Sequence, residues 1–348
     1  MRNTIFRFTG VLLGFSLGTL ATMLVTPVNL HSVSQGVANH PHNITLEQNR
    51  VGLNGAERAP ASSVAQTVHI LRQIKTGSMD TRIPPAAKPL LTRLKHELRD
   101  LIIDIINAPD NQQETPQHLR AMILAHLEKE GVTVKEPPEE IDAGEYFSNP
   151  YVYGDIHSLR IEQPVGQPEM LAATTTLGVC CGSDSSLYLF EKKGNQWALV
   201  LAQEANDYDE VNGAQGRFSY AVSPTDARNH FFVVTANVNP WCTSNWQSLR
   251  YKVLRLGSDA YRPHVILNDR DTIFLGEEPP YQLHVKKNSF TLGFTSDEFM
   301  DILNDGEEPN PEEIANSRTV KYLINGDKAK RVSGPKSRAH DKASNDSP

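Results

Sequence analysis

The chain has 348 residues, of which 39% are hydrophobic and 22% are charged. This is the composition of a globular protein, and the length leaves room for two domains. The formal net charge is -7, and no cluster of Lys and Arg interleaved with aromatic residues offsets it. Phosphate contacts need such clusters, so we expect no nucleic-acid partner.

The N-terminal segment, residues 1–38, has the pattern of an export signal. Arg2 and Arg7 precede an apolar run, and no charged residue then appears until Glu47. The apolar stretch is also long enough to cross a bilayer once, so a cleaved signal peptide and an uncleaved signal-anchor both fit the pattern. We therefore expect an exported protein (periplasmic, cell-surface or secreted), with a single N-terminal membrane anchor if the signal is not cleaved. The polar residues 39–61 are expected to form a linker.

Residues 62–135 are predicted to form a small helical domain. Apolar residues recur at the three-to-four spacing of an amphipathic helix near residues 63–76, 89–107 and 116–130. Thr115 is a good N-cap for the third helix. We expect these helices to pack mainly on one another, although the apolar stripes could instead bind a partner.

Residues 151–332 are predicted to form a β domain, which makes the chain an α+β protein. A proline-rich acidic linker, residues 136–150, precedes it, and beyond this linker the hydrophobic period changes from three-to-four to two. The tail, residues 333–348, is rich in Lys and Ser, lacks large apolar residues and is expected to be disordered. Central strands about 60 residues apart indicate three repeated units. These strands are predicted at residues 171–179, 231–239 and 289–295.

The first two units can be aligned residue by residue. With Cys181 placed on Cys242, Asp184 falls on Asn245, and both loops lead into a Ser-Leu pair and a second strand. Repeats of this kind are typical of propeller-like β-meanders, and a two-sheet β-sandwich of the same strands is the alternative. The connecting loops of such units are expected to emerge at the same end of the domain.

All three cysteines, Cys180, Cys181 and Cys242, lie in the second half of the chain. Cysteines of exported proteins are normally oxidised, and the matched loops predict a Cys181–Cys242 disulfide, with Cys180–Cys242 as the variant. Neither a Cys-x-x-Cys pair nor a cysteine–histidine spacing indicates a metal site, so we expect no metal and no cofactor.

The same loops supply a candidate ligand-binding rim. Asp184 follows the first central strand, and Asn245 lies between Trp241 and Trp246 after the second. An acidic insertion, residues 297–313, occupies the matching place in the third unit and is expected to be a loop. Carboxylates beside exposed indole rings suit a sugar or a cation. In the competing interpretation Asp184 and Asn245 cap turns and the tryptophans belong to the core.

Familiar catalytic motifs are missing from the sequence. It contains no Gly-x-Ser-x-Gly, no His-Glu-x-x-His, no phosphate-binding Gly-rich loop and no dinucleotide fingerprint. We therefore expect a non-enzymatic binding or scaffolding module of the cell envelope or secreted fraction, with a glycan or a protein as its partner. The alternative hypothesis is a carbohydrate-active hydrolase with its carboxylates on the rim.

Overall fold

The computed structural model describes most of the chain between Ser63 and Pro335. The expected signal, the linkers and nearly all of the C-terminal tail lie outside the described residues, as do Trp241 and the three cysteines, Cys180, Cys181 and Cys242. What is described belongs to one compact unit, Glu57–Pro348. The described residues are 63–74, 82–135, 153–179, 182–205, 208, 213–226, 230–240, 244–276, 279–304 and 310–335.

The helical region comprises helices α1 (Ser63–Leu71), α2 (Ala87–Ile106) and α3 (Pro116–Lys129), with a short 3-10 turn, η1 (Pro109–Asn111), before α3. Helix α3 begins where predicted, because the Thr115 hydroxyl accepts a hydrogen bond from the backbone N–H of His118 at 3.3 Å. No helix among the described residues is both long enough and apolar enough to cross a membrane.

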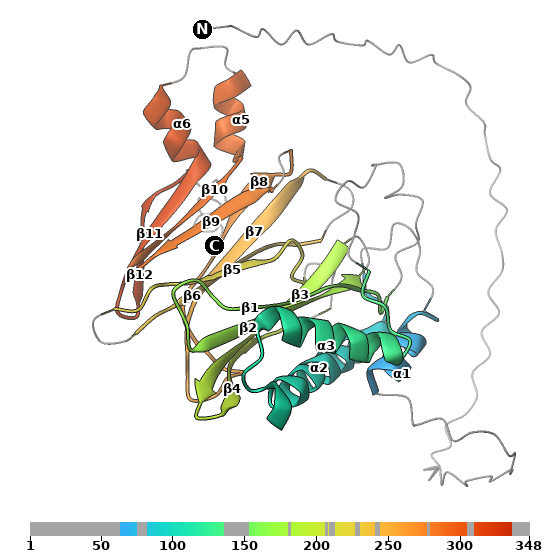
Figure 1. Cartoon of the computed structure of the whole chain (residues 1–348). Helices are drawn as coiled ribbons and strands as arrows, with labels where there is room; N and C mark the ends of the chain where they lie inside the picture. The colour runs from blue at the N-terminus through green and yellow to red at the C-terminus, as the bar shows by residue number, and fades with distance from the viewer. Residues whose placement is uncertain are drawn as a thin grey trace, which may run out of the picture. The chain divides into compact units, whose positions relative to one another are not determined.

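The β region consists of three four-stranded antiparallel sheets in which each strand pairs with its neighbours in the chain (Figure 1). The three predicted central strands correspond to β2, β6 and β10, and each is the second strand of its sheet in chain order. The predicted α+β class is thus confirmed as a helical region followed by three β-meanders. Their strands are β1 (Ile156–Glu162), β2 (Met170–Val179), β3 (Gly182–Lys193), β4 (Gln196–Gln203), β5 (Ser219–Val222), β6 (Val233–Val238), β7 (Trp246–Arg255), β8 (His264–Phe274), β9 (Tyr281–Lys286), β10 (Ser289–Phe294), β11 (Thr319–Asn325) and β12 (Lys328–Ser333).

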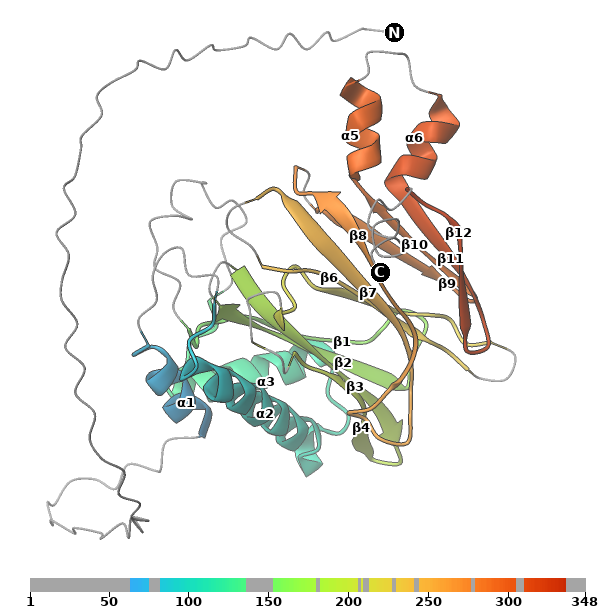
Figure 2. The same cartoon turned by 180° about the vertical axis from the view of Figure 1, so that it is seen from behind.

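The acidic insertion that was expected to be a loop contains two short helices, α5 (Asp297–Asn304) and α6 (Pro311–Arg318). They connect β10 to β11 at one end of the third sheet (Figure 2). The Ser296 hydroxyl accepts the backbone N–H of Phe299 at 3.0 Å and donates to the carbonyl of Ser317 at 2.5 Å. A capped helix start and a cross-link between the two helices therefore replace the expected loop.

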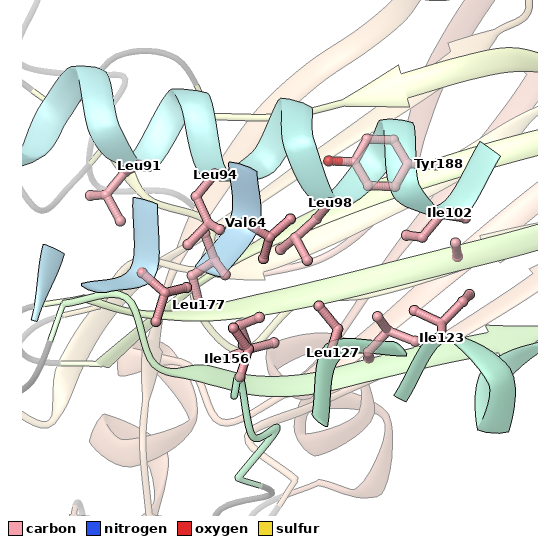
Figure 3. Close-up of a cluster of buried hydrophobic side chains, with 14 of the residues drawn as sticks. Val64, Leu91, Leu94, Leu98, Ile102, Ile123, Leu127, Ile156, Leu177 and Tyr188 are labelled. Atoms are coloured by element: carbon pink, nitrogen blue, oxygen red, sulfur yellow. The ribbon is translucent and has the colours of Figure 1, made fainter. Parts of the chain in front are cut away.

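The apolar stripe of α2 packs on one face of the first sheet as well as on the other helices (Figure 3). Leu94, Leu98 and Ile102 are fully buried and belong to the same cluster as Ile156 and Leu177 of the sheet. The helical region and the first sheet therefore share one hydrophobic core.

The second sheet packs against both of its neighbours. Its Val233 and Leu254 pack with Leu189 on the other face of the first sheet. On the opposite face of the second sheet, Tyr251 contributes to the core shared with the third sheet, where the rings of Phe290 and Tyr322 stack at 5.0 Å. The layers therefore follow the chain: helices, first sheet, second sheet, third sheet.

Because helices and first sheet share a core, they should unfold together. We expect Leu94→Ala to destabilise the protein by about 2–5 kcal/mol, since it leaves a cavity at a fully buried position. Urea unfolding followed by far-UV circular dichroism and by tryptophan fluorescence should give coincident transitions. Val165→Ala, at a position that is 92% exposed, is the control and should change little. Two separate transitions would contradict the shared core.

Candidate functional site

The face of the first sheet that looks toward the second sheet changes from apolar to polar along its strands. Ala172, Leu187 and Leu189 lie in the apolar half, which packs on the second sheet. Farther along β2 and β3, on the same face, hydroxyl side chains replace them and line a groove of about 320 Å³. We call this the hydroxyl groove; it is lined by Ser158, Arg160, Glu162, Thr174, Thr176, Ser183, Ser185 and residues 217–220.

A row of hydroxyl groups crosses three strands of the groove floor. Ser158 donates a hydrogen bond to the Thr176 hydroxyl at 3.2 Å, and the hydroxyls of Thr176 and Ser185 are 3.0 Å apart. The strand register places these three residues directly opposite one another. Because each hydroxyl can both donate and accept, the row can bind a ligand that carries hydroxyl groups of its own.

The opposite wall carries an arginine and a tyrosine. The Tyr220 hydroxyl donates to Glu162 Oε1 at 2.5 Å. Burial of the phenol, together with this carboxylate, raises the pKa of Tyr220, so the hydroxyl remains a donor at physiological pH. Arg160 and Arg217 also line the groove, together with the Glu162 carboxylate, and both arginines are exposed.

Arg217 has a strained backbone. Its φ of +40° makes it the one non-glycine residue with a positive φ among the residues that the structure describes. A conformation of this kind costs on the order of 1–3 kcal/mol and persists only where the surroundings enforce it, commonly at functional sites. Here the Tyr281 hydroxyl, shared between the carbonyls of Arg217 at 2.6 Å and Ala236 at 2.8 Å, holds the peptide in place.

Residues 213–217, the junction segment, connect all three sheets. The carbonyl of Gln215 accepts the backbone N–H of Ser185 in the first sheet at 2.9 Å, and the carbonyl of Gly216 accepts that of Val238 in the second at 3.0 Å. Tyr281, in the third sheet, donates its hydroxyl hydrogen bond to the carbonyl of Arg217, so the segment also contacts that sheet. Gly216 is needed for this approach, because a Cβ there would lie 2.8 Å from the carbonyl oxygen of Val238. The wall of the hydroxyl groove is therefore fixed where the three sheets meet.

A buried ion pair anchors the junction segment to helix α2. Asp184 lies on β3 between Ser183 and Ser185, so its side chain points to the opposite face of the sheet, where it is fully buried. Its carboxylate pairs with the equally buried ammonium of Lys95 and accepts hydrogen bonds from the Tyr208 hydroxyl and, at 2.9 Å, from the backbone N–H of Gln215. These bonds satisfy a charge that would be costly to bury alone.

A second acidic group of the first sheet is held in a similar way. Glu204 accepts hydrogen bonds from Arg99 at 3.2 Å and from the Tyr188 hydroxyl at 2.9 Å. Burial and the negative charge of Glu204 raise the pKa of Tyr188, which keeps that hydroxyl a donor. Lys95 also donates to the carbonyl of Ala205 at 2.7 Å. Helix α2 thus binds the chain where β4 ends as well as the junction segment.

The structure places the predicted rim residues in different surroundings. Asp184 is buried in contact with α2 rather than exposed at a loop tip. Asn245 is exposed, and its carbonyl accepts the backbone N–H of Leu275 at 2.8 Å. Trp246 is 38% exposed, and its ring packs 5.2 Å from that of Phe274. Trp241, Cys181 and Cys242 lie outside the described residues.

The residues of the hydroxyl groove were not singled out from the sequence. Their signal was an interruption of the apolar pattern, because Thr174 and Thr176 follow Ala172 on the same face of a strand that begins and ends with apolar residues. Arg217 carried no signal of its own, since a positive φ in a non-glycine residue cannot be recognised from residue type.

Comparison with known proteins adds no further constraint, because neither a family model, nor a curated protein, nor a solved structure matches the chain. Within the described part of the chain, no group of three or more His, Cys, Asp or Glu side chains is arranged to hold a metal ion.

The Lys95–Asp184 pair gives a direct test of the anchor. We expect Lys95→Met to destabilise the protein by about 3–5 kcal/mol, since it leaves a carboxylate buried without its cation. The double variant Lys95→Met/Asp184→Leu should lose less than the sum of the two single variants, as measured by urea unfolding in a double-mutant cycle. Lys129→Met, on the exposed surface of α3, is the control. Strictly additive losses would show that the two side chains do not interact.

Proposed function

We propose that this chain is an exported, non-enzymatic binding module of the cell envelope or secreted fraction, and that the hydroxyl groove binds an acidic glycan. The observation that carries the proposal is the strained backbone of Arg217, which lies in a groove that Arg160 also lines and whose floor carries hydroxyl groups. Export is supported by the basic start and apolar run of residues 1–38.

The chemistry of the groove matches such a ligand in two ways. Serine and threonine hydroxyls exchange hydrogen bonds with sugar hydroxyls in either direction. Guanidinium groups bind carboxylates or sulfates through two parallel hydrogen bonds. A volume of about 320 Å³ falls at the lower end of the range for small-ligand sites, which suits a short stretch of saccharide rather than a large ligand.

A binding role is favoured over a hydrolase at this site because glycoside hydrolysis ordinarily uses two carboxyl groups on either side of the scissile bond. Among the residues that line the groove, Glu162 supplies the one carboxylate, and Tyr220 is hydrogen-bonded to it. Asp184, the other acidic candidate from the sequence, is occupied by its buried partners.

We further propose that the three sheets are repeats of one β unit arranged as propeller-like blades. Support comes from the four-stranded meander in each sheet, the equivalent positions of β2, β6 and β10, and the face-to-face packing of consecutive sheets. Helices α1–α3 then cover the outer face of the first blade where a closed ring would place another blade.

The glycan proposal is tested by isothermal titration calorimetry with an oligogalacturonate and a neutral cello-oligosaccharide of equal length. We expect the acidic ligand to bind more tightly. Arg160→Ala and Arg217→Ala should each weaken its binding at least tenfold, because hydrogen bonds to charged groups contribute about 1.5–3 kcal/mol. Arg82→Ala, at an exposed position outside the groove, should leave the affinity unchanged.

The variant Arg217→Gly distinguishes an effect on ligand affinity from an effect on the stability of the fold. It should bind as weakly as Arg217→Ala but be more stable by about 1 kcal/mol, because glycine adopts a φ of +40° without strain. Absence of acidic-glycan binding, or full affinity in both Arg217 variants, would contradict the proposed site.

The Cys181–Cys242 disulfide is also proposed. Its support comes from nearby residues: a Cβ on Gly182 would lie 2.9 Å from the Cβ of Pro240, so the residue after Cys181 closely approaches the residue two positions before Cys242. Gly182 has a φ of +152°, which also favours glycine. A bridge here would close a loop of about 60 residues and stabilise the protein by about 3–4 kcal/mol.

Non-reducing peptide mapping of the exported protein should recover the Cys181–Cys242 cross-link. Cys181→Ser should lower the free energy of unfolding by the amount given above, whereas Cys180→Ser should not. The reverse pattern would assign the bridge to Cys180, and three free thiols would exclude it.

A further inference from the structure

The third sheet is the last layer of the stack, and its two faces differ in chemistry. One face carries Phe290, Leu292 and Tyr322, which pack on the second sheet. Along β9 and β11 the residues of the other face alternate with the buried or half-buried ones and are exposed to solvent. We call this exposed surface of β9–β12 the outer face of the third sheet.

The outer face is basic, although the whole chain carries a net charge of -7. The sequences of β9, β10, β11 and β12 contain neither Asp nor Glu. Five exposed lysines lie on this face or at its two hairpin turns: Lys286, Lys287, Lys321, Lys328 and Lys330. None of the five forms an ion pair with another residue that the structure describes. The positive charge of this face is therefore directed to solvent.

The strand register gathers three of these lysines around one exposed leucine. Leu323 of β11 lies directly opposite Lys330 of β12 on one side and Ser289 of β10 on the other. Ser289 is in turn opposite Lys286 of β9. Lys321 precedes Leu323 by two residues and therefore lies on the same face. Leu323 is 43% exposed, so an apolar side chain is presented to solvent among cations.

A second exposed apolar residue lies close by on β12. Lys321 pairs with Ser333 and the next residue of β11 pairs with Arg331, which leaves Val332 as the extra residue of a bulge. Val332 is 44% exposed. Apolar side chains exposed within a charged surface are a feature of surfaces that contact a partner.

The nearby carboxylates do not neutralise the lysines. Asp327, the one carboxylate in the two hairpin turns, lies 3.4 Å from Arg255 of the second sheet. Arg331 faces inward and pairs with Asp271 at 3.1 Å. The acidic insertion with α5 and α6 is at the end of the sheet opposite the hairpin turns (Figure 2). Residues 336–348 contain three Lys or Arg and two Asp, so their composition adds no net negative charge.

We propose that the outer face of the third sheet docks on an anionic lipid bilayer, with its lysines at the headgroups and Leu323 and Val332 in the interface. Lysines act here as point charges, which respond to the charge density of a surface and need no fixed ligand geometry. The exposed apolar side chains favour a bilayer over a polar polymer, because the interface takes up apolar groups beside its headgroups. The apolar run within residues 1–38 is long enough to cross a bilayer, so an uncleaved chain would be held beside this surface.

The proposal is tested on the whole chain by acetylation of its lysines, read residue by residue by mass spectrometry. The chain is mixed with vesicles of phosphatidylcholine alone or of phosphatidylcholine with about one third phosphatidylglycerol. We expect the five lysines of the outer face to react about threefold more slowly, or slower still, on the anionic vesicles. Lys129, exposed on α3, should react equally on both, because the surface potential falls off within a Debye length. Attachment through the N-terminal segment does not obscure this result, because each lysine is read separately.

Two matched triple variants locate the effect. Lys286→Gln/Lys321→Gln/Lys330→Gln leaves Lys287 and Lys328 as reporters, and both should lose their protection on anionic vesicles. The control removes the same charge at exposed positions outside the third sheet, as Lys129→Gln, Lys135→Gln and Lys193→Gln together, and should keep that protection. Leu323→Ser should weaken the protection less than the lysine variant does, because it removes apolar contact and leaves the charge.

Three outcomes would overturn the proposal. Equal acetylation of the outer-face lysines on both kinds of vesicle would show that the face does not meet the anionic surface. Unchanged protection in the outer-face triple variant would place the contact elsewhere. Protection by the oligogalacturonate, without protection by anionic vesicles, would assign the face to an acidic polymer instead. Each of these results leaves the hydroxyl groove untouched, because the glycan proposal depends on Arg160 and Arg217.

Discussion

The arrangement of this molecule depends on one buried carboxylate. Asp184 is removed from water by the packing of α2 on the first sheet, and Lys95, Tyr208 and the backbone N–H of Gln215 supply the partners that a buried carboxylate needs. These partners come from a helix, from the region following β4 and from the junction segment. Docking of the helix and placement of the junction segment are therefore one event, because neither can satisfy the carboxylate without the other.

The alternation of side chains along β3 separates the buried anchor from the hydroxyl groove. Ser183 and Ser185 face the hydroxyl groove, whereas Asp184 between them faces the helices. A shift of one residue in the register of β3 would exchange these roles, placing a carboxylate in the groove and a hydroxyl opposite Lys95. The buried ion pair thus also specifies strand register, since the cost of an unpaired Lys95 opposes any slip.

Structural features that depend on the local sequence pattern could be predicted from the sequence, whereas those that depend on partners far away in the chain could not. The start of α3 followed from Thr115, and the second strand of every sheet followed from spacing and β-branched composition. Asp184 was placed on an exposed rim because nothing local distinguishes a carboxylate that will meet a lysine of α2. The insertion before β11 was expected to be a loop, yet Pro311 is the first residue of α6, where proline is tolerated.

The junction segment also lies between two polar cavities. Gln215 lines a polar cavity of about 590 Å³ between the first and second sheets, and Arg217 lines the hydroxyl groove, so the two cavities are separated by two residues of one segment. Energetic coupling between sites requires an element with two discrete arrangements that each ligand biases differently. This segment is instead hydrogen-bonded to the first and second sheets and to Tyr281 of the third, and Gly216 fits against Val238 without space for a side chain. Such a segment transmits little motion. The physical argument therefore favours a groove wall of fixed shape over one that changes with the contents of the other cavity.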